Sequence, residues 1–185
     1  MKSIYFLLTR TDTVPARVIR AFKGGRFSHT SLALTPEMNH LYSYARRRLH
    51  NFFIAGIRVE DIHKDIFALY PDCDSALYEI TVSDSAYEKV KAEIERYYSN
   101  YNKAKYNFLG TIPLAMGIKI QRKYKLTCSQ FVALMLDATG EIELPKDPYL
   151  MLPNDFMSIS GIRKVYEGPL KDCHVPELEP VHIKN

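Results

Sequence analysis

One cysteine and one distant histidine are the residue types that a thiol nucleophile and its base require. Cys128 lies in the run Leu-Thr-Cys-Ser-Gln-Phe-Val, and His29 lies in the run Phe-Ser-His-Thr-Ser-Leu. A thiolate attacks carbonyl carbon, and an imidazole can pair with the thiolate and later protonate the leaving group. Cys128 and His29 are therefore the candidates for covalent acyl chemistry.

The residues around Cys128 predict the start of a helix. Thr127, followed three residues later by Gln130, forms a capping-box pattern that makes Thr127 the N-cap and Cys128 the first helical residue. The free backbone N–H groups at a helix N-terminus favour a thiolate and can lower a cysteine pKa from about 8.5 to roughly 3.5–7.5. The buried face of this helix is expected to hold Phe131, Val132, Met135 and Leu136.

A wider pattern adds to this pair. The histidine precedes the cysteine, the cysteine begins the run Cys-Ser-Gln-Phe-Val, and residues 106–110 are Tyr-Asn-Phe-Leu-Gly. Together these motifs resemble the circularly permuted, YiiX-like branch of the NlpC/P60 cysteine peptidase superfamily, from about Ile4 through Tyr166. The resemblance implies an α+β, papain-like fold in which an antiparallel sheet packs against a helical layer, with the cysteine at a helix N-terminus.

The resemblance also suggests further site residues. Tyr106 matches the tyrosine of the family's Tyr-x-x-Gly motif, which implies a role in substrate binding or as an oxyanion donor, and Tyr124 is a local competitor. Family members place a polar residue on the strand after the histidine strand, where this chain has Ser43. Glu60 is chemically better suited to orient an imidazole, so both are kept as candidates. Arg46 is a candidate for binding a carboxylate or phosphate.

The other cysteines give no sign of a metal or cofactor site. Cys73, Cys128 and Cys173 cannot all pair, and no spacing typical of a zinc site is present. We expect reduced thiols and no cofactor. Cys73 lies between aspartates that should raise its pKa, which makes it a poor nucleophile.

Length and hydropathy predict one domain spanning 1–185, with a core over about 4–166 and a loose tail over 167–185. The apolar run at residues 4–8 is too short for a signal-peptide core, and the stretch over 108–118 is too short to span a bilayer. We expect a soluble, cytoplasmic protein.

The hydrophobic pattern predicts a sheet of about five strands and three helices. The strands are expected at 4–8, 27–34, 41–45, 57–60 and 76–82, with a last strand at 162–166 as a further candidate. Helices are expected at 13–22, after a cap at Ser83, and from Cys128 to near Gly140. The apolar face of the second helix is expected to bury Tyr87, Val90, Ile94, Tyr97 and Tyr101.

Basic residues gather on either side of His29, at positions 17, 20, 23 and 26 and again at 46–48. We interpret them as a solvated face, with a cleft rim for an anionic substrate as the alternative. No nucleic-acid motif is present, and the spacing of Tyr97 and Tyr101 favours burial over stacking on bases.

The expected function is a cysteine hydrolase that cleaves a peptide or isopeptide amide, or an acyl ester, through a thioester on Cys128 with His29 as base. The expected substrates are a small peptide, a peptidoglycan fragment or an acyl compound. The alternatives are a thiol acyltransferase acting on lipid, an inactive binding module with the same cleft, and a basic surface that binds anionic lipid or nucleic acid.

Overall fold

A computed structural model describes residues 1–10, 25–48 and 51–175 of the chain. It is an α+β structure with one mixed sheet. The strands are β1 Lys2–Thr9, β2 His29–Ala33, β3 Leu41–Arg48, β4 Asn51–Glu60, β5 Asp74–Val82, β6 Lys105–Tyr106, β7 Lys125–Leu126 and β8 Arg163–Pro169. The α-helices are α2 Asp65–Ala68, α3 Asp84–Ser99, α4 Thr111–Ala115 and α5 Cys128–Asp137, and the 3-10 turns are Pro148–Leu150, Pro153–Ser158 and Leu170–Asp172.

The sheet has eight strands in the order β7-β6-β4-β3-β2-β1-β5-β8, so the expectation of about five was wrong. All its neighbouring strands are antiparallel except β6 and β7, which pair in parallel. Two of the additional strands, β6 and β7, have two residues each, too few to give a period-two pattern. β2 lies inside the sheet between β1 and β3, which gives His29 a fixed backbone.

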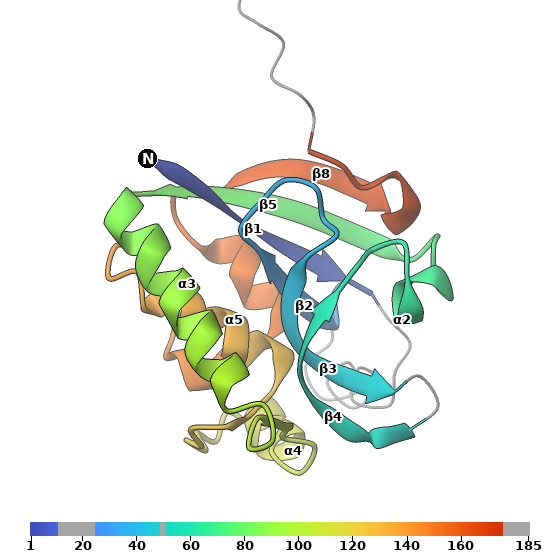
Figure 1. Cartoon of the computed structure of the whole chain (residues 1–185), viewed down its shortest axis with the longest axis vertical. Helices are drawn as coiled ribbons and strands as arrows, with labels where there is room; N and C mark the ends of the chain where they lie inside the picture. Colours follow the sequence, from blue (N-terminus) through green and yellow to red (C-terminus); the bar gives the residue numbers. More distant parts are fainter. Residues whose placement is uncertain (11–24, 49–50, 176–185) are drawn as a thin grey trace, which may run out of the picture.

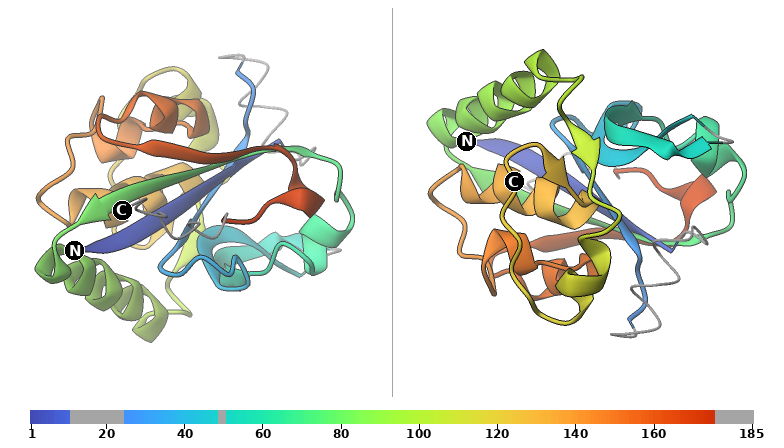
Figure 2. Two further views of the ribbon diagram at one scale, coloured as in Figure 1. Left: turned by 90° about the horizontal axis from the view of Figure 1, so that it is seen from above. Right: turned by 90° about the horizontal axis from the view of Figure 1, so that it is seen from below.

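Strand β1 packs against apolar side chains on both faces of the sheet. Ile4, Phe6 and Leu8 belong to one buried cluster, whereas Tyr5 and Leu7 belong to a second one. Both faces of β1 are therefore buried, which accounts for its continuous apolar run. Helices α3 and α5 lie together over the first face (Figure 1), and the view from below in Figure 2 shows α5 in front of β1 and β5.

The predicted helices agree with the structure where it describes them. Ser83 is the N-cap of α3, and Val90, Ile94 and Tyr97 are buried. Tyr101 lies beyond the end of α3 and is 43% exposed, so its predicted burial was wrong. The helix expected over 13–22 lies outside the described residues.

The ordered structure extends beyond residue 166, where the loose tail was expected to begin. β8 continues to Pro169 alongside β5, and Leu170 and Cys173 are buried in the second cluster. The apolar side chains of Leu170 and Cys173 are what hold this segment.

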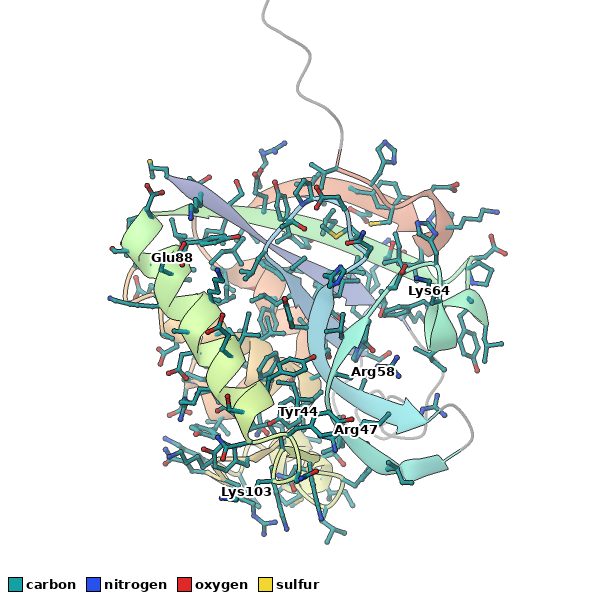
Figure 3. The ribbon with its side chains drawn as sticks, viewed as in Figure 1. Tyr44, Arg47, Arg58, Lys64, Glu88 and Lys103 are labelled. Carbon is teal, nitrogen blue, oxygen red and sulfur yellow. The ribbon has the colours of Figure 1, made fainter. Side chains whose placement is uncertain are left out.

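Two of the basic residues near His29 take part in the fold. Arg26 pairs with Asp74 and Glu167. Arg47 lies 3.6 Å above the ring of Tyr101 and donates at 2.7 Å to the carbonyls of Tyr101 and Ala104 (Figure 3). Arg47 thus ties the turn after α3 to strand β3. The basic positions 17, 20 and 23 lie outside the described residues.

No helix within the described part of the chain is long and apolar enough to cross a bilayer.

Candidate active site

Cys128 is the first residue of α5, and the predicted capping box fixes it there. The Gln130 amide donates to Thr127 Oγ1 at 3.3 Å, and the Thr127 amide donates to Gln130 Oε1 at 3.0 Å. The Gln130 side chain also donates to the Tyr149 carbonyl at 2.8 Å. Phe131 and Val132 are fully buried behind the cysteine, as predicted. Hydrogen bonds on one side and apolar packing on the other thus fix the start of α5.

His29 lies between Cys128 and Glu60. Its Nε2 is 2.9 Å from Glu60 Oε2, and the ring also hydrogen bonds Cys128. Because Nε2 faces the carboxylate, Nδ1 is the nitrogen left for the sulfur. The Glu60 and His29 side chains are only 2% and 12% exposed, and Cys128 is 2% exposed. The structure therefore brings together a thiol, an imidazole and a carboxylate away from bulk water.

The two candidates for orienting His29 differ in geometry. Ser43 Oγ is 3.4 Å from His29 Nε2, and it donates to the Thr30 carbonyl at 3.0 Å. Glu60 is closer to the ring and carries a charge that favours imidazolium. Its position follows from the pairing of β3 with β4, in which Glu60 lies opposite Leu41.

Ser31 was missed by the sequence reasoning. Its hydroxyl donates to Glu60 Oε2 at 2.7 Å and lies 3.2 Å from His29 Nε2. Ser31 follows His29 by two residues, so a strand places both side chains on the same face. That spacing was the available signal. Glu60 Oε1 is buried and has no hydrogen-bond partner among the described residues.

The charges of Cys128, His29 and Glu60 stabilise one another. Burial would lower the pKa of His29, but Glu60 and Cys128 outweigh it through their charges and hydrogen bonds, raising that pKa from 6.5 to about 10. Burial would raise the pKa of Cys128, yet the His29 charge and hydrogen bond, with backbone N–H donors from Thr30 and Ser129, lower it below 9.0. Both shifts favour a thiolate–imidazolium pair over a neutral thiol and imidazole.

Glu60 stays ionised for the same reason. Burial would raise its pKa, but the charge of His29 and hydrogen bonds from His29 and Ser31 keep that pKa below the usual 4.5. Arg58 contributes a further lowering of the Glu60 pKa. Arg58 is thus an arginine whose charge acts on Glu60, whereas the role predicted for Arg46 in binding a substrate anion stays a prediction. The Arg46 carbonyl accepts a hydrogen bond from the Arg58 guanidinium at 2.5 Å.

Tyr106 is the tyrosine that hydrogen bonds Cys128. Burial, followed by the charge of the thiolate and the hydrogen bond to it, raises the Tyr106 pKa well above 10. The hydroxyl therefore stays protonated and acts as a donor. The competitor Tyr124 instead packs edge-on against Tyr97, with ring centroids 5.8 Å apart.

A tight turn follows Tyr106. The Gly110 amide donates to Asn107 Oδ1 at 3.1 Å, and a Cβ on Gly110 would come within 2.0 Å of Asn107 Nδ2. A side chain at position 110 would therefore displace the Asn107 amide group and disturb this turn. Three residues separate Tyr106 from Gly110, one more than in a Tyr-x-x-Gly motif.

The remaining cysteines lie elsewhere and are unreactive by environment. Burial, together with Asp74 and Asp72, raises the pKa of Cys73 to about 11, and burial raises the pKa of Cys173 to about 12. No group of three or more metal-ligating side chains occurs in the ranges that the structure describes.

Comparison with known proteins gave no match, either to a family model or to a curated protein.

Proposed function

We propose that this protein is a cysteine hydrolase with a papain-like fold of the permuted NlpC/P60 kind, in which Cys128 is the nucleophile, His29 the base and Glu60 the residue that orients His29. One observation carries the proposal: the His29 ring is hydrogen-bonded to Cys128 and to Glu60, and all three side chains are shielded from water. A buried carboxylate beside an imidazole that contacts a thiol is the arrangement of a nucleophile, a base and an orienting group.

The reaction follows from the charge state. The Cys128 thiolate attacks the carbonyl carbon of an amide or ester, and the C=O electron pair moves onto oxygen. The imidazolium N–H facing the sulfur then gives its proton to the leaving amine or alcohol as the carbonyl re-forms, which leaves a thioester and a neutral imidazole. The neutral His29 takes a proton from water, the hydroxide attacks the thioester, and the thiolate–imidazolium pair returns.

The oxyanion formed in both steps needs donors. The Cys128 backbone N–H, at the helix start, and the Tyr106 hydroxyl are the donors that we assign to it. The high pKa of Tyr106 keeps that proton in place through the cycle. Substrates of this site are acyl compounds, with small peptides or peptidoglycan fragments first and acyl esters second. A thiol acyltransferase would differ only in using an acceptor other than water.

The test is to trap the thioester. The protein is mixed with p-nitrophenyl acetate and quenched in acid, and the intact mass is measured with and without neutral hydroxylamine. We expect one acetyl group per chain, removed by hydroxylamine and located on Cys128. His29→Ala should slow the acetylation by roughly 100-fold or more.

Matched controls come from the other two thiols. Cys73→Ser and Cys173→Ser should be acetylated like the wild type, because their pKa values keep these thiols protonated. Acetylation that persists in Cys128→Ser, or that is the same in His29→Ala as in the wild type, would contradict the proposal.

A further inference from the structure

Exposed apolar side chains gather in one short stretch beside the candidate site. Within residues 109–118, Leu109 is 85% exposed, Met116 62%, Ile118 51% and Ile112 47%. The stretch includes helix α4, whose opposite side is anchored because Leu114 is buried against Leu152. We call these four exposed side chains the apolar lip. Clustered exposed apolar groups of this kind mark a surface that contacts something other than water.

The segment that contains the lip is rich in positive charge. Residues 96–136 contain seven lysines and arginines and no aspartate or glutamate. Lys119 pairs with Asp147 from outside this range, and the segment also holds exposed Lys103, Lys105, Arg122, Lys123 and Lys125. Figure 3 shows Lys103 at the lower end of the molecule, next to the α4 region.

The pairing of β6 with β7 places two of these lysines next to each other. Lys105 lies directly opposite Lys125, and both residues are exposed. Like charges opposite each other on neighbouring strands destabilise a sheet. An anionic surface would remove that repulsion, whereas water and salt only weaken it.

We propose that the apolar lip and its lysines dock the protein onto an anionic lipid bilayer. Leu109, Ile112, Met116 and Ile118 would enter the headgroup region, while the surrounding lysines meet lipid phosphates and carboxylates. α4 lies at the lower end of the molecule and in front in the view from below (Figures 1 and 2), and all four side chains of the lip are exposed. Exposed apolar groups in a segment that also carries several exposed cations suit an anionic bilayer better than a folded partner protein.

The lip also starts close to the nucleophile. Leu109 follows Tyr106 by three residues, within the turn closed by Asn107 and Gly110, and Tyr106 hydrogen bonds Cys128. Docking would therefore bring the candidate site to the membrane surface. The docking itself does not depend on catalysis.

The absence of tryptophan from the chain allows a direct test. Leu109→Trp puts one reporter in the lip, and Leu69→Trp puts a matched reporter on another exposed leucine, at the end of α2. Both variants are titrated with phosphatidylcholine vesicles and with vesicles containing phosphatidylserine. We expect the fluorescence of the Leu109 reporter to shift to the blue and to be quenched by brominated lipid, only with the anionic vesicles. The Leu69 reporter should not change.

Sedimentation with the same vesicles measures affinity. Leu109→Asp with Met116→Asp, and separately Lys105→Gln with Lys125→Gln, should each weaken binding roughly tenfold or more. The controls Leu69→Asp and Lys64→Gln with Lys91→Gln should stay within about twofold of the wild type. No binding to anionic vesicles, equal binding to neutral ones, or binding unaffected by the lip and lysine variants would overturn the proposal.

Discussion

The imidazole of His29 is held from two sides, and this determines what each neighbour does. Glu60 accepts from Nε2 at 2.9 Å, which leaves the other nitrogen for the sulfur of Cys128. Ser31 occupies the same carboxylate oxygen at 2.7 Å and prevents it from moving. The ring therefore has one orientation, and that orientation presents its second N–H to the thiolate.

Glu60→Gln should weaken the ion pair between the Cys128 thiolate and the His29 imidazolium. Without the negative charge the imidazolium loses its main support, so the Cys128 pKa should rise toward an ordinary thiol value near 8.5. We expect the pH midpoint of iodoacetamide alkylation to move up and thioester formation to slow by roughly 100-fold. Ser43→Ala is the control, because Ser43 lies 3.4 Å away, and its effect should stay below about tenfold. An unchanged alkylation midpoint in Glu60→Gln would show that Glu60 does not support the ion pair.

The ion pair also predicts an unusual pH dependence of stability. Between about pH 7 and 8.5, folding adds a proton to His29, whose pKa rises from 6.5 to about 10, and removes one from Cys128, whose pKa is lowered. These changes oppose each other, so the pair should give the wild type almost no slope in its free energy of unfolding. In Cys128→Ala only the uptake by His29 remains. The folded state then binds more protons than the unfolded state, and stability should fall as pH rises, by at most about 1.4 kcal/mol per unit.

Urea denaturation at several pH values between 7 and 8.5 measures both slopes. The double variant Cys128→Ala with His29→Gln is the control, because it removes both titrating groups and should restore a flat profile. If Cys128→Ala is as flat as the wild type, His29 is not protonated in the folded variant, and Glu60 alone does not hold the imidazolium without the thiolate.

At the scale of elements, the capping box of α5 has two roles. Thr127 Oγ1 satisfies the Gln130 amide and also fixes the first turn, which carries Cys128. Ser83 provides the same cap to α3, where its hydroxyl accepts from the Ala86 amide at 3.1 Å. The two caps are alike in chemistry and differ in whether a candidate nucleophile follows them.

Thr127→Ala and Ser83→Ala should therefore differ in one measurement and agree in another. Each should lower the free energy of unfolding by about 1 kcal/mol, because each leaves a helix amide without its cap. Only Thr127→Ala should slow alkylation of Cys128, and Thr127→Ser should restore it. An equal loss of thiol reactivity in both alanine variants would mean that general destabilisation, and not the position of Cys128, is responsible.

The elements that the sequence predicted best are those whose pattern is local. The apolar run of β1, the period of α3 and the capping box of α5 each determine their own structure. β6 and β7 could not be predicted, because these two-residue strands form only by pairing with distant segments: β6 with β4 and β7, and β7 with β6. For the same reason the choice between Ser43 and Glu60 stayed open: it depends on how β3 and β4 pair, which is a tertiary property.

At the scale of the whole molecule, several buried polar atoms of the described residues have no hydrogen-bond partner, and the hydroxyl of Tyr44 is one that can be tested. Tyr44 belongs to β3 (Figure 3); its side chain is fully buried and packs against Phe131 of α5, with ring centroids 5.2 Å apart. Its hydroxyl has no hydrogen-bond partner in the described part of the chain. A buried hydroxyl without a partner costs about 1–3 kcal/mol.

Tyr44→Phe should raise the free energy of unfolding by about 1 kcal/mol, because it removes this hydroxyl and keeps the ring. Tyr87→Phe is the opposite case, since the Tyr87 hydroxyl donates to the Leu34 carbonyl at 2.9 Å, and it should lower stability by about 1 kcal/mol. Both are measured by urea denaturation. A loss of stability in Tyr44→Phe would contradict the expectation and would indicate that its hydroxyl has a partner.

The order of the site residues along the chain has a consequence for synthesis. His29, Ser31, Ser43 and Glu60 all lie within the first 60 residues, and Cys128 follows 68 residues after Glu60. At roughly 5–20 residues per second, a ribosome needs roughly 3–14 s to make that interval. The growing chain thus carries the candidate base and its carboxylate long before it has the candidate nucleophile, and Cys128 is an ordinary thiol until the chain folds. The lowered pKa proposed to make it reactive arises only when α5 packs against β2, so activation of the thiol depends on folding.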